Sequence, residues 1–214
     1  MSWTDNKILL EYSKYTACRD IFQSVCDELG KHYMTKGFKY LRSKPNLTIE
    51  TEDIKLVIGF SSSRSNIPGE WVAFEILPGF YSKLLAKTGN FKGFILGHTS
   101  LFYHKYTNNP KQIKVIQLFG DVVERIDEYS NESKIIESHG CNVYALDKQK
   151  FDQIVNFIDS KIIPWTTKLS TKEGIRELTN NASPTRKWSL LNSDFVKYVQ
   201  LKFPVIDIEN ELES

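Results

Sequence analysis

The residues that come closest to a catalytic arrangement are an acid-x-lysine triplet, Asp53-Ile54-Lys55, and an acid further upstream, Glu28. Nucleases of the restriction type use such a triplet to hold a divalent cation and to position the attacking water, because carboxylate oxygens suit Mg²⁺. The Pro-Asp pair that precedes the triplet in those enzymes is replaced here by Pro45-Asn46. Acid-x-lysine triplets also arise by chance in a lysine-rich chain. We therefore interpret the triplet as an ordinary hairpin turn.

The other residues that could carry chemistry do not assemble into a motif. The sequence contains no phosphate-binding G-x-x-x-x-G-K-[ST] loop, no G-x-G-x-x-G and no G-x-S-x-G. Zinc sites need clustered Cys and His ligands, and the histidines are scattered along the chain. We predict no catalytic residue, no metal site and no cofactor.

The cysteines and the distribution of apolar residues indicate the cellular compartment in which the protein acts. The three cysteines are odd in number and form no C-x-x-C pair, which favours reduced, buried thiols in a cytosolic protein. The first residues lack the apolar stretch of a secretory signal, and no apolar run approaches the ~18–20 residues of a membrane span. We expect a cytoplasmic protein that does not act in a membrane.

The feature that points most clearly to a function is a basic, aromatic-rich stretch in the middle of the chain. From Ile76 to Gly120 there is no acidic residue, and lysines are interleaved with phenylalanines and tyrosines. These side chains could bind the phosphates and bases of a single-stranded nucleic acid, or meet an acidic protein surface. The aromatics could equally form the core, with solvated lysines around them. The residues that we predict to contact a partner are Arg64, Lys83, Lys87, Lys92, Tyr103 and Tyr106.

The elements that must position these residues begin with a long amphipathic helix. Apolar residues recur at three- and four-residue spacing from Thr16 to Lys36, and Gly37 is a typical helix terminator. Turn residues then separate four short apolar or alternating segments. We predict strands at 38–41, 47–51, 54–60 and 71–77, the last ended by Pro78-Gly79. Strands at this spacing favour an antiparallel meander packed on the first helix.

The rest of the chain predicts a mixture of helices and short extended segments. Helices are expected at 80–87, at 113–127, after Asp147 as far as Pro164, at 172–180 and at 193–203. Extended segments are expected at 94–96 and 142–146, a polar connector at 103–110, and a frayed acidic tail at 207–214.

The length and composition fit an α+β protein with an ordinary core. The chain has 214 residues, of which 41% are hydrophobic and 25% charged, and its formal net charge is +2. This composition excludes a collagen-like or wholly disordered chain. We expect an antiparallel β-meander packed against an N-terminal helix, with additional C-terminal helices. The expected organisation is a core domain at 1–180 and a helical segment with an acidic tail at 181–214, packed on the same domain.

One part of the sequence resembles a known group of proteins. A helix ending in Lys36-Gly37-Phe38-Lys39, a strand pair, and a strand ending in Gly59-Phe60-Ser61-Ser62-Ser63-Arg64 precede the strand at 71–77. This arrangement, over about Ile21 to Leu77, is similar to small bacterial domains of unknown function found among immunity proteins of toxin systems. The resemblance implies a non-catalytic binding protein and assigns no functional residue. The leading hypothesis is therefore an immunity-type or regulatory protein that occludes a protein partner. The alternative is a nucleic-acid-binding or nuclease-related protein that uses residues 76–120.

Overall fold

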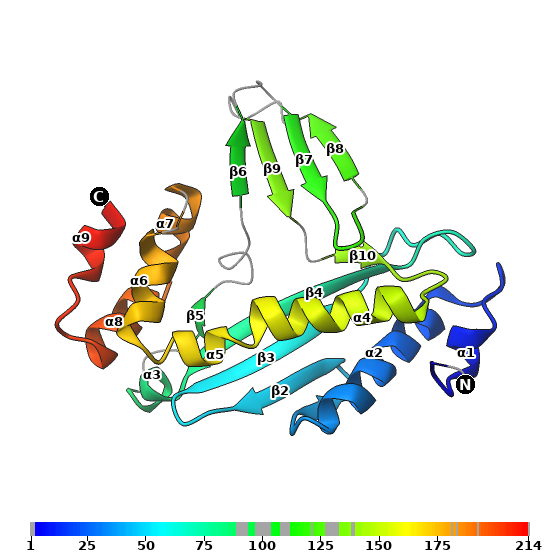
Figure 1. Ribbon diagram of the computed structural model, residues 1–214, viewed down its shortest axis with the longest axis horizontal. Coiled ribbons are helices and arrows are strands. Elements are labelled where there is room, and N and C mark those ends of the chain that lie inside the picture. The colour runs from blue at the N-terminus through cyan, green and yellow to red at the C-terminus, as the bar shows by residue number, and fades with distance from the viewer. Residues whose placement is uncertain are drawn as a thin grey trace. The chain divides into compact units, whose positions relative to one another are not determined.

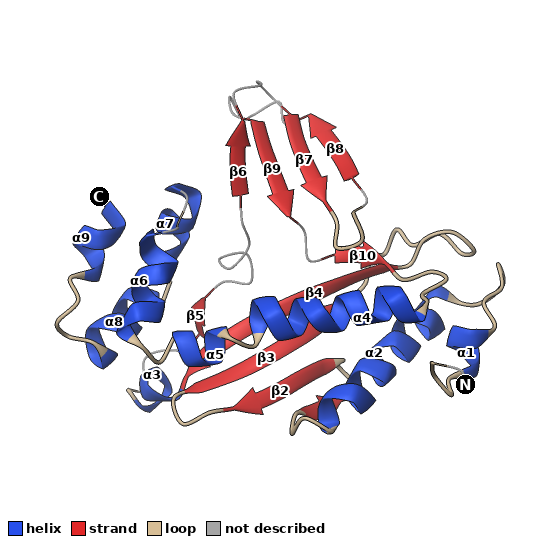
Figure 2. Ribbon diagram, viewed as in Figure 1, coloured by secondary structure: helices blue, strands red, loops and turns tan. Residues whose placement is uncertain are grey.

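The fold is α+β, as the sequence predicts (Figures 1 and 2). The computed structural model describes residues 3–88, 94–96, 104–107, 112–120, 122–126, 133–137, 140–180, 182, 184–191 and 193–213. The helices are α1 (Lys7–Leu10), α2 (Cys18–Met34), α3 (Lys83–Lys87), α4 (Lys148–Phe157) with a π-helical turn (Ile158–Ile162), α5 (Trp165–Lys168), α6 (Lys172–Asn180), α7 (Pro184–Leu191), α8 (Phe195–Lys202) and α9 (Ile208–Glu213). The strands are β1 (Lys39–Leu41), β2 (Asn46–Glu50), β3 (Ile54–Ser61), β4 (Ala73–Ser82), β5 (Phe94–Leu96), β6 (His104–Thr107), β7 (Gln112–Ile116), β8 (Val122–Ile126), β9 (Ser133–Glu137) and β10 (Gly140–Asn142).

The Cα positions divide the chain into two compact units, each built from three separate segments. Unit 1 contains Met1–Asn46, Phe60–Leu77 and Phe102–Asn156. Unit 2 contains Leu47–Gly59, Pro78–Leu101 and Phe157–Ser214. The division falls within β2, β3 and β4, so these strands contribute residues to both units.

The larger sheet has the strand order β1-β2-β3-β4-β10, and β5 also pairs with β4. Its first four strands follow one another in sequence and in space, which confirms the predicted meander. The expected adjacency of the strands at 54–60 and 71–77 is also confirmed, because β3 and β4 are neighbours. On the other side of β4, β10 pairs antiparallel at residues 73–75 and β5 at residues 80 and 81.

Helix α2, the long N-terminal helix that the sequence predicts, packs on this sheet within unit 1. Ile21, Val25 and Leu29 are fully buried on one side of α2, as the amphipathic pattern predicts. The ring of Phe22 lies 5.9 Å from that of Phe74 on β4, and Phe74 stacks on Phe60 of β3 at 5.2 Å. Gly37 has φ of +87°, the left-handed conformation expected of the residue that ends a helix.

Strand β4 is longer than predicted. The pair Pro78-Gly79 was expected to end it, because proline lacks the N–H of a sheet hydrogen bond. Instead β4 continues to Ser82, and the helix expected from Phe80 begins only at Lys83. Pro78 lies between the residues of β4 that pair with β10 and those that pair with β5. Its missing N–H therefore interrupts neither of these two ladders.

The prediction of a helix at 113–127 is wrong. Strands β7 and β8 form an antiparallel hairpin there, with Gln112 opposite Ile126 and Ile116 opposite Val122. Gly120 adopts a φ of +87° in the connecting turn, a conformation that no residue within a right-handed helix has. The β-branched residues of both segments suit strands. The connector expected at 103–110 is corrected too, because His104–Thr107 forms β6, and the second sheet has the order β6-β9-β7-β8.

Two further expectations change near the C-terminal half. The strand expected at 142–146 is wrong in its bounds, because β10 begins at Gly140 and ends at Asn142. The side-chain oxygen of Asn142 accepts hydrogen bonds from the N–H groups of Val72 and Tyr144. The acidic tail is not frayed, since residues 208–213 form α9. Ile208 and Leu212 are one turn apart and buried, with exposed fractions of 1% and 2%.

The remaining helical predictions are close to the structure. Helix α6 has the predicted bounds, and α8 covers most of the helix expected at 193–203. The three cysteines are free thiols, of which Cys26 and Cys141 are buried. No helix among the described residues is long and apolar enough to span a bilayer.

Candidate functional site

Strand β3 has two sides of different character, and the less buried side carries the candidate site. Ile54, Leu56, Ile58 and Phe60 are buried and form what we call the buried face of β3. The alternating residues Lys55, Val57, Gly59 and Ser61 are partly exposed and form its open face. Side chains of successive strand residues point to opposite sides of a sheet, which explains the alternation.

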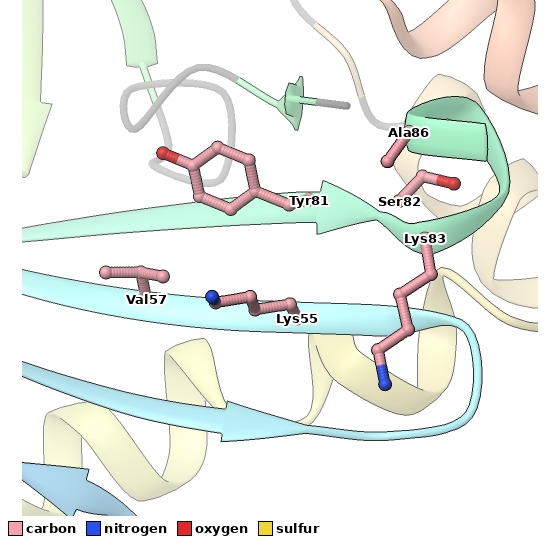
Figure 3. Close-up of a pocket in the computed structure, with 6 residues that line it drawn as sticks. All are labelled: Lys55, Val57, Tyr81, Ser82, Lys83 and Ala86. Atoms are coloured by element: carbon pink, nitrogen blue, oxygen red, sulfur yellow. The ribbon is translucent and has the colours of Figure 1, made fainter. Parts of the chain in front are cut away.

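A pocket of about 410 Å³ lies on the open face, within unit 2. Its described lining comes from β3, from the end of β4 and from α3: Lys55, Val57, Tyr81, Ser82, Lys83 and Ala86. Figure 3 shows Lys55 and Val57 side by side on β3, with Tyr81 on the neighbouring strand. The pocket therefore combines two cationic groups with aliphatic and aromatic surface.

The position of Lys83 follows from local hydrogen bonds. Ser82 caps α3, since its hydroxyl oxygen accepts a hydrogen bond from the N–H of Leu85 at 3.1 Å. The backbone N–H of Lys83 donates to the carbonyl of Asp53 at 3.0 Å, which brings the start of α3 to the β2–β3 turn. The Lys83 Nζ then donates to the carbonyl of Thr51 at 2.7 Å. In Figure 3 this nitrogen points towards that turn.

A single carboxylate contacts both lysines of the pocket. Oε1 of Glu50, the last residue of β2, lies 3.7 Å from the Lys55 Nζ, and its Oε2 lies 3.1 Å from the Lys83 Nζ. All three side chains are water-accessible, with exposed fractions of 44% for Lys55, 38% for Lys83 and 47% for Glu50. Ion pairs between such exposed groups are weak, because water and salt screen them. The carboxylate is therefore held between the lysines only loosely.

The acid-x-lysine triplet does not act as a unit. The Asp53 carboxylate accepts a hydrogen bond from the Lys202 Nζ of α8 at 2.8 Å, whereas Lys55 contacts Glu50. Glu28, the third residue of the hypothetical nuclease site, contacts Lys31 at 2.8 Å. The part of the chain that the structure describes contains no group of three or more His, Cys, Asp or Glu side chains suited to a metal.

Asp53 instead has structural neighbours. The phenol of Tyr198 lies in the same region of unit 2 and donates to the carbonyl of Leu169 at 2.6 Å. Burial raises the pKa of Tyr198 above its ordinary value, and the negative charge of Asp53 raises it further. The ion pair between Asp53 and Lys202 thus connects the β2–β3 turn to α8. Asp53 is not among the described residues that line the pocket, so its role there is structural.

The structure places the predicted contact residues in different surroundings. Lys83 lines the pocket, whereas Lys87 is exposed at the other end of α3. Arg64 is exposed in the loop between β3 and β4, in unit 1. Tyr106 belongs to β6, but its side chain is not described, and Lys92 and Tyr103 lie outside the described residues. Of the predicted set, only Lys83 is therefore shown to line this pocket.

Sequence reasoning did not assign Val57, Tyr81 or Glu50 to a binding site, and it considered Lys55 only for catalysis. The alternation along β3 was a usable signal for Lys55 and Val57, which share one side of the strand. Tyr81 and Lys83 join them only through the pairing of β3 with β4 and the approach of α3 to the β2–β3 turn.

A second pocket in unit 2, of about 360 Å³, is a weaker candidate. Its described lining is Thr88, Lys197, Gln200 and Leu201. It has one cationic side chain among these residues, against two in the pocket of the open face. The pocket of the open face therefore has more groups that could contact an acidic ligand.

Comparison of the chain with protein-family models, with curated proteins and with solved structures gives no match.

Proposed function

We propose that this protein is a non-catalytic binding protein that attaches to an acidic site on a protein partner through the pocket of the open face. It acts by occluding the partner, in the manner of an immunity-type or regulatory protein. The observation that carries the proposal is the placement of Lys55 and Lys83 beside the apolar surface of Val57, Tyr81 and Ala86, in a pocket of about 410 Å³.

This combination suits a protein surface for two physical reasons. A few buried side chains, often aromatic ones such as Tyr, supply most of the binding energy of protein interfaces, while charges at the rim speed association and exclude wrong partners. Pockets for small-molecule ligands typically have volumes of about 300–1,000 Å³, so this pocket of about 410 Å³ is large enough to take a side chain of the partner. Tyr81 and Val57 can provide the apolar contact, and the two lysines the charge.

A nucleic-acid partner is the second candidate, because Tyr81 beside two lysines is also an arrangement that stacks a base and contacts phosphates. Affinity for nucleic acid grows with the number of phosphates that lysines neutralise. Glu50 already shares the charge of Lys55 and Lys83. The pocket thus has a small net positive charge, which favours a local acidic group over a polyphosphate chain.

The experiment is site-specific photo-crosslinking in cells. Ala86 is exposed and lines the pocket, so benzoylphenylalanine at this position should be tolerated and should react with whatever occupies the site. We expect a protein adduct that disappears with Lys83→Glu and persists with Lys87→Glu. The second variant is the matched control, because Lys87 lies one turn further along the same helix.

Benzoylphenylalanine at Gln153, an exposed residue of α4 in unit 1, controls for random collisions. The proposal is wrong if Ala86 gives no adduct beyond the Gln153 control, or if the adduct survives Lys83→Glu. An adduct that contains nucleic acid and no protein would replace the proposal with the second candidate.

A further inference from the structure

We propose that Glu50 is an internal competitor that occupies the place of the partner's carboxylate, so that the pocket selects an acidic residue next to an aromatic or aliphatic one. This inference rests on the proposed function and names the chemistry that the pocket recognises. Its starting point is that each Glu50 oxygen faces a different lysine, Oε1 at 3.7 Å from Lys55 and Oε2 at 3.1 Å from Lys83.

The two ammonium groups thus form a receptor that matches one carboxylate. A carboxylate has two oxygens that each accept hydrogen bonds, and charge-assisted bonds of this type are stronger than neutral ones. The chain itself supplies the example, since Glu50 forms an ion pair with each lysine at the same time, although its 3.7 Å distance from Lys55 is longer than a hydrogen bond. Another carboxylate of similar geometry can make the same contacts.

Lys83 keeps its position when Glu50 leaves. Its Nζ donates to the Thr51 carbonyl at 2.7 Å, and its backbone N–H donates to the Asp53 carbonyl. Both acceptors are backbone groups of the β2–β3 turn, and neither depends on the Glu50 side chain. The backbone bond therefore fixes the stem of Lys83 beside the turn, which lowers the entropic cost of binding a new carboxylate.

The two ion pairs that hold the competitor are weak. The Glu50 side chain is 47% exposed and its two lysines are 44% and 38% exposed, so water can replace each contact. An incoming carboxylate gains an advantage over Glu50 only when it carries further contacts. Val57, Tyr81 and Ala86 offer these contacts to an apolar side chain attached to the same ligand.

This arrangement makes a specific prediction for Glu50→Gln. The neutral amide competes poorly for the lysines and leaves the pocket with a larger net positive charge. Glu52 provides the matched control, because it is an exposed acid in the adjacent turn. Glu52→Gln removes the same charge without removing the carboxylate that contacts Lys55 and Lys83.

The probe is the capped peptide acetyl-Glu-Phe-Glu-Phe-amide, titrated into the ¹⁵N-labelled full chain and followed by NMR. We expect resonances of Lys55, Val57, Tyr81 and Lys83 to shift, with a dissociation constant about 3- to 10-fold lower in Glu50→Gln and less than 2-fold lower in Glu52→Gln. The neutral peptide acetyl-Gln-Phe-Gln-Phe-amide should bind every variant at least about 10-fold more weakly than the acidic peptide binds Glu50→Gln.

Equal strengthening by Glu50→Gln and Glu52→Gln would overturn the inference, since it would reduce the effect to overall charge. Equal binding of the neutral peptide, or shifts outside the pocket, would overturn it as well. An oligothymidylate of eight nucleotides forms a third arm, and binding of this probe without the acidic peptide would also contradict the inference. The Ala86 crosslink tests the protein partner separately, so the competitor role can fail while the proposed function stands.

Discussion

The two faces of β3 differ in composition although they belong to the same eight residues. On the buried face, Ile54, Leu56 and Ile58 are fully inaccessible to water. On the open face, Lys55 and Val57 stay partly exposed and line a pocket. Folding selects for tight apolar packing on the first face, whereas the second face tolerates charge and an incompletely filled surface. The stability of the protein and its capacity to bind should therefore be separable by substitutions one residue apart.

The largest expected difference is between Leu56→Ala and Val57→Ala. Leu56 is fully buried, so its truncation leaves a cavity and should lower the free energy of unfolding by about 2–5 kcal/mol. Val57 is partly exposed, and its truncation should cost about 1 kcal/mol or less. Urea denaturation of both variants measures the difference. Equal losses would show that the open face is part of the core.

Alkaline pH should have a smaller effect on the free energy of unfolding, because it ionises buried groups such as the Cys26 thiol. Burial raises the pKa of the Cys26 thiol above its ordinary value of 9.0. The folded chain then keeps a proton that the unfolded chain loses above this pH. The stabilisation is complete below pH 9.0 and is lost as the pH rises through the folded pKa, by at most about 1.4 kcal/mol per pH unit.

Denaturation at pH 8, 9 and 10 should therefore show a steeper loss of stability in the wild type than in Cys26→Ala, which has no thiol to ionise. Above pH 10 partly buried tyrosines add to the loss in both proteins, since desolvation raises the pKa of Tyr12 from 10.0 to about 12. Parallel curves between pH 8 and 10 would contradict the prediction for Cys26.

A smaller difference is expected between two ion pairs, one that connects the β2–β3 turn to α8 and one that lies in the pocket. Asp53 and Lys202 are 27% and 29% exposed, less than the 47% and 44% of Glu50 and Lys55. A double-mutant cycle with Asp53→Asn and Lys202→Met should give a coupling energy of about 1 kcal/mol. The cycle with Glu50→Gln and Lys55→Met should give less than about 0.5 kcal/mol. A reversed order would mean that Glu50 belongs to the supporting structure and is no easily displaced competitor.

The smallest effect on stability is expected from salt. Apolar packing dominates the buried face, so raising sodium chloride from about 0.05 to 0.5 M should change the free energy of unfolding by less than about 0.5 kcal/mol. When the crosslinking is repeated in a cell lysate, the same change in salt should reduce the yield of the Ala86 protein adduct several-fold, because exposed lysines attract the partner. An adduct yield that does not respond to salt would indicate that apolar contacts alone form the interface.

Most of the fold could be predicted wherever one local pattern admitted one structure. The stripe of α2 was predicted from residue spacing, the strand β3 was predicted from its run of apolar and branched residues, and the bounds of α6 were predicted as well. The prediction of a helix at 113–127 was wrong because the apolar residues of this segment fit both a helix and a hairpin. Gly120 adopts a positive φ in the turn, which a hairpin accommodates and a helix does not. The prediction of a frayed tail was wrong because α9 is stabilised by the burial of Ile208 and Leu212. The sequence of a short charged segment does not reveal such packing.

The sequence by itself determined the α+β class, the meander on the first helix and the excess of lysine over acid in residues 76–120. These properties depend on composition and on spacing within about ten residues. Only the tertiary structure decided that Lys83, about thirty residues from Thr51 along the chain, binds its carbonyl. Only the structure showed that Glu50 lies between two lysines and that Asp53 forms an ion pair with Lys202. The physical reason is that strand pairing and helix docking join distant residues, so a site made of such residues exists only once the chain has folded.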